Sequence, residues 1–345
     1  MATATPKAVA PDPEEVVADE TPRRTPAAIA AILAGLLTIG VSVYIGIVYA
    51  DLPSVTVAET LAPLVNEGTP PEVSPVIVEL AFVDENAVAI VLGAILNGLG
   101  LMAAGFALSL LVRAARHRKP EIPPFLPVAV LLAGILLALA SATTQILNVV
   151  SAGDFVSGGD RSQAAVDGLG GGVGLQILQS VGLFALFALS FGGYLYGALN
   201  AMRVGLLTRF MGVLGIIVGV APILGVLVPA AGSGFPLVQA FWLIGLGLIY
   251  LDRWPGGVPP AWSAGEARPW PTQLELREAR DRERLEREGQ APSDEPDAEP
   301  GPEAEAEPEA EPGRTREPLD APGATQPRAP TRAHPSSKKR KRKRR

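Results

Sequence analysis

The feature that most constrains this chain is a series of apolar stretches that contain no Asp, Glu, Lys or Arg. Six stretches have this character: Ala27–Ala50, Ala87–Val112, Phe125–Val150, Val173–Leu199, Phe210–Ala231 and Phe235–Leu251. Hydrocarbon cannot satisfy backbone N–H and C=O groups, so a segment that crosses a bilayer must be helical or part of a closed barrel. A helix needs roughly 20 apolar residues to cross about 30 Å. We therefore predict an all-α, polytopic transmembrane bundle of about six helices over residues 27–251.

Three other interpretations of these stretches are weaker. Buried helices of a soluble protein rarely stay uncharged over such lengths, and the stretches lack the ten-residue alternation of a membrane barrel. The first stretch also resembles a secretory signal, with Val48-Tyr49-Ala50 as a cleavage site, and cleavage would leave five spans. A signal core is shorter, however, roughly 7–15 residues, and here an acidic leader precedes it.

The distribution of basic residues predicts the orientation in the membrane. Lys and Arg favour the cytoplasmic side of short loops. With the N-terminus inside, the inner connections 113–124 and 200–209 both carry Lys or Arg, whereas the outer connection 51–86 has none and 151–172 has only Arg161. We expect both termini to lie in the cytoplasm.

The chain outside the apolar stretches has a different composition. We expect residues 1–26 to be a disordered cytoplasmic N-terminus, and residues 252–290 to be a juxtamembrane segment with a short charged helix at Gln273–Glu288, stabilised by Glu and Arg at i,i+4 spacing. The juxtamembrane part contains Trp254, Trp262 and Trp270 among prolines, a pattern typical of rings at the headgroup level.

Residues 291–345 are rich in Pro, Ala and Glu, which predicts a disordered tail because such a sequence buries too little apolar surface to offset chain entropy. The tail ends in an unbroken basic run: Lys338, Lys339, Arg340, Lys341, Arg342, Lys343, Arg344 and Arg345. The partners that this run suggests, besides the lipid bilayer itself, are anionic lipid headgroups or nucleic acid bound without specificity. A merely solvated run is the alternative, and no protein partner is indicated.

Polar side chains are sparse within the apolar stretches, and five of them form a candidate intramembrane cluster. Gln176, Gln179 and Ser180 share a helix face through i,i+3 and i,i+4 spacing, and Gln145 and Asn148 are three residues apart. One interpretation is a polar pocket between the third and fourth helices. The other is interhelical hydrogen bonding that holds the bundle together.

Two glycines in the fifth stretch, Gly215 and Gly219, have the GxxxG spacing that lets helix backbones approach closely. The pattern predicts either packing inside the bundle or a dimer face.

No catalytic, cofactor-binding or metal-binding residue is indicated by the sequence. Cysteine is absent, and the two histidines, His117 and His334, lie in basic stretches. Ion-coupled transporters and many intramembrane enzymes keep ionisable groups at depth, and the six stretches contain none. We therefore expect that the protein is not an enzyme and needs no cofactor.

Two segments carry a family resemblance: Asn200–Val220, a basic loop that runs into a Gly/Leu/Ile stretch, and Trp254-Pro255-Gly256-Gly257. In these the chain resembles a family of uncharacterised bacterial multispan membrane proteins, a domain of unknown function. The resemblance implies a bacterial inner (cell) membrane but no activity or site. The function that we predict is a non-enzymatic membrane scaffold or interaction protein, and the alternative is a carrier or channel for an uncharged or amphiphilic solute.

Overall fold

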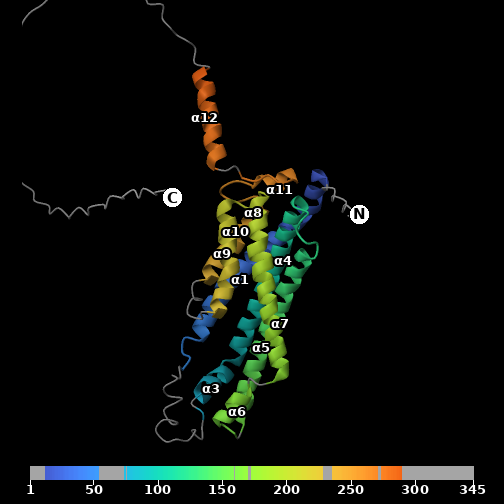
Figure 1. Cartoon of the computed structure of the whole chain (residues 1–345). Coiled ribbons are helices and arrows are strands. Elements are labelled where there is room, and N and C mark those ends of the chain that lie inside the picture. Colours follow the sequence, from blue (N-terminus) through green and yellow to red (C-terminus); the bar gives the residue numbers. More distant parts are fainter. Residues whose placement is uncertain are drawn as a thin grey trace, which may run out of the picture. The chain divides into compact units, whose positions relative to one another are not determined.

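The computed structural model describes residues 12–53, 74, 76–158, 160–169, 172–227, 235–270 and 273–289, and all the regular secondary structure in them is helical (Figure 1). The helices are α1 (Pro13–Val48), α3 (Ile77–Glu85), α4 (Ala87–Arg118), α5 (Leu126–Ser157), α6 (Gln163–Leu169), α7 (Val173–Phe187), η1 (Ala188–Gly197), α8 (Ala198–Arg203), α9 (Arg209–Leu227), α10 (Phe235–Tyr250), α11 (Pro260–Ala264) and α12 (Gln273–Gly289). Helices α7, η1 and α8 form one continuous helix, and η1, its middle part, is a π-helix. The described residues up to Arg284 belong to one compact unit.

Four of these helices are long and apolar enough to cross a bilayer: α1, α4, α5 and the continuous helix Val173–Arg203. This confirms the prediction of an all-helical, multi-pass architecture. Helices α9 and α10 are apolar but shorter; the 16 residues of α10 span only about 24 Å at 1.5 Å per residue. The connection between them, residues 228–234, lies outside the described residues.

The prediction of a disordered N-terminus is wrong for residues 13–26, because α1 begins at Pro13 rather than after Pro26. Asp12 caps the helix by accepting a hydrogen bond from the N–H of Glu14 (3.0 Å), and proline suits the first helical turn. The helix continues through Pro22 and Pro26, each of which removes one backbone hydrogen bond. Packing offsets this cost, since side chains before Pro26 are buried, among them Val16.

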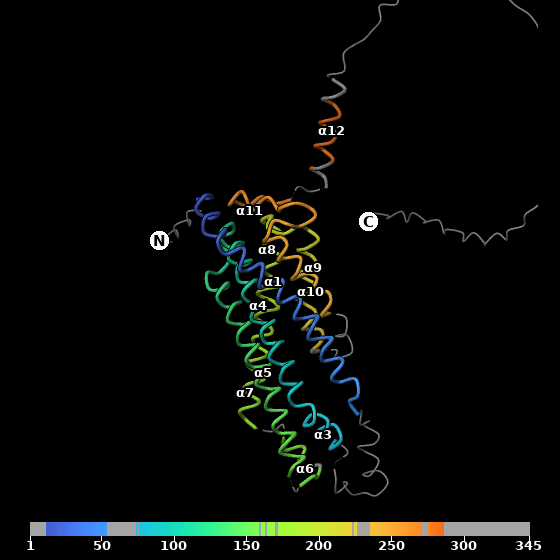
Figure 2. Tube along the Cα trace, turned by 180° about the vertical axis from the view of Figure 1, so that it is seen from behind, coloured from blue at the N-terminus to red at the C-terminus, as the bar shows by residue number. Residues whose placement is uncertain are grey.

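Helix α1 packs between α4 and α10, α4 packs along α5, and α5 packs along α7, while α9 lies against η1 and α8 (Figures 1 and 2). Glycine permits the closest of these approaches. A Cβ added to Gly105 of α4 would lie 2.9 Å from the Cα of Gly134 in α5, so neither position admits a larger residue without separating the two helices.

The GxxxG pair of α9 serves packing inside the bundle. A Cβ on Gly219 would lie 2.7 Å from the backbone nitrogen of Leu195 in η1, and a Cβ on Gly215 would lie 2.6 Å from the Cβ of Ala198 in α8. Since both glycines face helices of the same chain, the alternative of a dimer face at this motif does not hold.

The stretch Val76–Val83, which is apolar except for Glu79, lies almost wholly in α3. Asn86 separates α3 from α4: its side-chain amide donates to the carbonyl of Phe82 (2.9 Å), and its backbone leaves helical geometry. The segment is therefore a separate helix, and it packs against α5.

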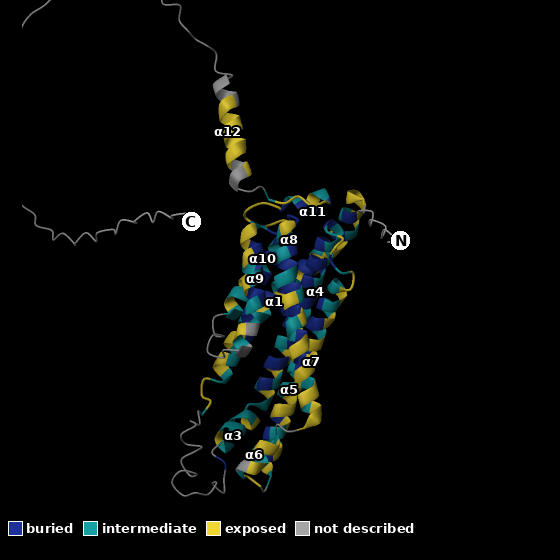
Figure 3. Cartoon of the chain, in the orientation of Figure 1, coloured by how far each residue is buried: buried dark blue, intermediate teal, exposed yellow. Residues whose placement is uncertain are grey.

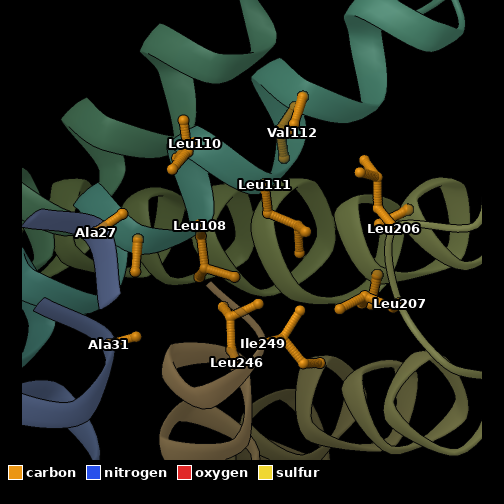
Figure 4. Close-up of a cluster of buried hydrophobic side chains, with 14 of the residues drawn as sticks. Ala27, Ala31, Leu108, Leu110, Leu111, Val112, Leu206, Leu207, Leu246 and Ile249 are labelled. Atoms are coloured by element: carbon orange, nitrogen blue, oxygen red, sulfur yellow. The ribbon is translucent and has the colours of Figure 1, made fainter. Parts of the chain in front are cut away.

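The best-packed part of the core lies toward the end of the bundle that carries α8 and α11 (Figure 3). Leu108 of α4 and Leu246 and Ile249 of α10 converge there, each fully buried (Figure 4). In α7, by contrast, only Gly182 and Ala185 are buried. The tighter end is also the end with most of the arginines, and it carries the site described next.

Candidate functional site

The most developed polar structure in the described chain lies at this end, which we call the arginine-rich end. It is formed by residues 13–26 of α1, the last turns of α4 up to Lys119, the loop 204–208, and the segment 252–270 with α11. These four segments are far apart in sequence, and each contributes hydrogen-bonding or charged groups.

Arg118, the last residue of α4, binds three of these segments together. Its Nη1 donates to Oε1 of Glu20 (2.7 Å) and to the carbonyl of Ala114 (2.9 Å), and its Nη2 donates to Oε2 of Glu20 (3.0 Å). Its Nε and Nη2 both donate to the carbonyl of Ala261 in α11, at 3.0 and 2.7 Å. The guanidinium has five N–H donors, so every one is used.

Glu20, the partner of Arg118, is almost fully buried, with 1% of its surface exposed. Nδ1 of His117 lies 3.2 Å from its Oε1. Glu20 precedes the apolar stretch that begins at Ala27. Burial raises its pKa, but the hydrogen bonds and positive charge of His117 and Arg118 outweigh burial, so the pKa lies below its ordinary value. The carboxylate is therefore ionised at neutral pH.

The ring of Trp262 contacts two of the cations of this end. The guanidinium carbons of Arg24 and Arg118 lie 4.9 and 5.6 Å from the ring centroid, and Tyr250 contacts the ring edge-on with centroids 5.5 Å apart. Its Nε1 donates to the carbonyl of Leu206 (2.9 Å). Trp262 is buried in protein and its ring is therefore not exposed to lipid, while its expected position at the headgroup level stays a prediction.

The segment 252–270 is held along the loop 204–208 by further hydrogen bonds. The N–H of Arg268 donates to the carbonyl of Val204 (3.0 Å), and Nε1 of Trp270 donates to the carbonyl of Leu207 (2.9 Å). Gly205 has φ +82°, and a Cβ there would lie 1.9 Å from the carbonyl oxygen of Arg268. Only glycine fits this crossing of two chains.

One more ion pair joins the beginning of α1 to the residues after α10. Nη2 of Arg24 donates to the carboxylate of Asp252 and to the carbonyl of Ile249. The arrangement at the arginine-rich end is thus closed on itself: its central charges are buried and paired. These bonds attach the chain that follows the last apolar stretch to the bundle.

The predicted polar cluster is only partly assembled. Gln145 and Gln179 both line an open groove of 310 Å³ between α5 and α7. Asn148, Gln176 and Ser180 are exposed and do not line it. Asn148 donates to Gln145 (3.2 Å), and the hydroxyl of Ser180 donates to the carbonyl of Gln176 (2.8 Å), so these bonds lie within single helices rather than between them.

A second polar cavity lies elsewhere, between α1, α4 and α10. It has a volume of 160 Å³, and its polar lining is Thr38, Ser42, Asn97 and Gln239. Nε2 of Gln239 donates to the hydroxyl of Tyr194 in η1 (3.0 Å), while the Asn97 amide makes no hydrogen bond within the described part of the chain. Gln239 is a residue that sequence reasoning missed, although an amide in an otherwise apolar stretch was a signal for it.

Sequence reasoning also missed Glu20 and Arg118 as a pair, because nothing local connects a carboxylate in an acidic leader with one arginine among several. The basic run Lys338–Arg345 lies outside the described residues. Comparison with protein-family models, with curated proteins and with solved structures found no match.

Proposed function

We propose that this chain is a non-enzymatic scaffold of a bacterial inner (cell) membrane, with six spans and both termini in the cytoplasm. In this proposal the four long apolar helices are spans one to four, and α9 and α10 are the fifth and sixth spans. The orientation is supported by the basic residues near the arginine-rich end, which the positive-inside rule assigns to the cytoplasmic face. At the opposite ends of the helices, the connection 51–86 carries no Lys or Arg.

The role that we propose is to present the charged C-terminal segment from a fixed base on the membrane. The observation that carries this proposal is the closed set of hydrogen bonds around Arg118, which joins α1, α4 and α11. Because 252–270 is built into the end of the bundle, the chain beyond Trp270 leaves from a rigid support. The basic run 338–345 then supplies a binding arm for anionic headgroups or nucleic acid.

Complementation of a gene deletion tests this proposal. A chain that ends at residue 289 should insert at normal abundance and fail to complement, whereas Asn97→Leu in the full chain should complement. Tags on both termini should be reached only after the cells are permeabilised. A truncated chain that complements fully would overturn the scaffold proposal.

A carrier for a small uncharged or amphiphilic solute is the second candidate, and the cavity at Asn97 and Gln239 favours it. Light scattering of reconstituted vesicles given a glycerol gradient would measure flux. A carrier predicts faster swelling than in empty liposomes, loss of the increment in Asn97→Leu, and no loss in Gln176→Leu, which alters an exposed amide outside the cavity. Swelling equal to that of empty liposomes speaks against transport of this class.

A further inference from the structure

A groove of 230 Å³ lies on the outer surface of the arginine-rich end, where α1, α4 and α5 meet. One end of it is basic, with Arg23 of α1 and Arg113 of α4. Apart from Ser109, the rest is apolar, lined by Phe106 and Leu110 of α4 and by Pro127, Val128 and Leu131 of α5. None of these residues belongs to the closed network around Arg118.

The two guanidiniums are held in place by one carboxylate. Nη1 of Arg23 and Nη2 of Arg113 both donate to Oδ2 of Asp19, at 2.6 and 3.0 Å. Each arginine has five donors, and these two bonds leave most of them available. The side chains remain 44% and 41% exposed. Two cations and one carboxylate leave one net positive charge, which matches the single negative charge of a phosphodiester.

Arg116 adds basic character beside this pair. It follows Arg113 by three residues, so the two side chains lie next to each other on the same face of α4. Within the described residues, the Nε of Arg116 is buried and has no hydrogen-bond partner.

The groove changes from charged to apolar along its length, as the bilayer does from headgroups to hydrocarbon. Arg23 precedes the apolar stretch of α1, and Arg113 directly follows that of α4, so both guanidiniums lie at the border of the hydrocarbon. Phe106 and Val128, which line the groove as well, are 40% and 57% exposed. A free phosphate ion would use only the basic end and leave this apolar wall uncovered.

The geometry points to a binding site for one anionic phospholipid, such as phosphatidylglycerol, with its phosphodiester between Arg23 and Arg113 and an acyl chain along Phe106 and Val128. Basic pockets between transmembrane helices are a recurrent means of binding anionic lipid headgroups. This site is distinct from the basic run 338–345, which offers charge without an apolar groove. A lipid held here would bridge α1, α4 and α5.

Lipid retention tests the site in the full-length protein. The protein is purified in mild detergent and incubated with phosphatidylglycerol. A high-salt wash then removes lipid adsorbed to the basic run, because salt screens exposed charges, and retained lipid is counted by native mass spectrometry. Arg23→Gln/Arg113→Gln should lower the bound fraction about tenfold or more. Val128→Trp should lower it as well, by filling the groove without changing charge.

The matched control is Arg203→Gln/Arg253→Gln, which removes two exposed arginines outside the groove and should retain lipid like the unaltered protein. Unaltered thermal unfolding of each variant excludes misfolding, and the single variants Arg23→Gln and Arg113→Gln replace the double variant if it unfolds early. Glycerol 3-phosphate in excess should not displace the lipid. Equal retention by the groove variants and the control, equal retention of phosphatidylcholine, or displacement by glycerol 3-phosphate would each overturn the proposal.

Discussion

The carboxylate of Glu20 and the guanidinium of Arg118 form a two-pronged ion pair, at 2.7 and 3.0 Å, inside the arginine-rich end of the bundle. The side chains are 2% and 0% exposed. Every donor of Arg118 is used: the pair joins α1 to α4, and further bonds from Arg118 to the carbonyl of Ala261 reach the segment after the last apolar stretch. Buried pairs of this kind are costly to break, because removal of one partner leaves an uncompensated charge.

We expect Arg118→Met to destabilise the protein by about 3–5 kcal/mol, since Glu20 is then buried without its cation. The measurement is thermal or denaturant unfolding in detergent. Glu20→Leu combined with Arg118→Met should be less destabilised than Arg118→Met alone, because no buried charge remains. A double variant as unstable as the sum of the two single variants would contradict this account of the pair.

The lowered pKa of Glu20 predicts a pH dependence. A carboxyl group whose pKa is lower in the folded state stabilises the fold above its ordinary pKa, here 4.5, and this contribution is lost as the pH falls through the folded value. The difference in unfolding temperature between the unaltered protein and Glu20→Gln should therefore be constant from neutral pH to about pH 5 and shrink at lower pH. A difference that stays constant to the acid limit of folding would be inconsistent with an ionised Glu20.

Trp262→Phe should loosen the segment 252–270. The variant keeps an aromatic ring near Arg24 but leaves the buried carbonyl of Leu206 without its donor, which costs about 1–3 kcal/mol. Cleavage after Glu266 by a glutamate-specific protease in detergent should accelerate by a corresponding factor, provided that local opening of the segment limits the rate. Trp254→Phe is the control, because the Trp254 ring nitrogen makes no hydrogen bond within the described chain, and its cleavage rate should not change.

Gly205→Ala should destabilise the same end by about 1–3 kcal/mol, owing to positive φ and to contact with the carbonyl of Arg268. The unfolding temperature is the readout. Gly225→Ala in α9 is a matched change, since a Cβ there meets nothing within 4 Å, and it should be neutral or stabilising by up to about 1 kcal/mol. Equal effects at both positions would show that the crossing at Gly205 is not restrictive.

The candidate sites show where sequence reasoning stops. It identified amides at helical spacing, yet only Gln145 and Gln179 share a groove, because spacing fixes the face of one helix and not the helix that packs against it. The cavity at Asn97 and Gln239 draws on three helices, and no spacing within one stretch predicts it. The groove at Arg23 and Arg113 is also formed by three helices, so spacing within one stretch does not predict it either.

The helical, membrane-spanning character of the chain follows from its sequence alone, because the need for backbone hydrogen bonds in hydrocarbon acts on each apolar stretch separately. The continuation of α1 through Pro22 and Pro26, the burial of Trp262 and the pairing of Glu20 with Arg118 are evident only from the folded structure. Those outcomes depend on which surfaces meet. Burial against a partner distant in sequence changes the free energy of a proline, an indole or a carboxylate by more than its local preference does.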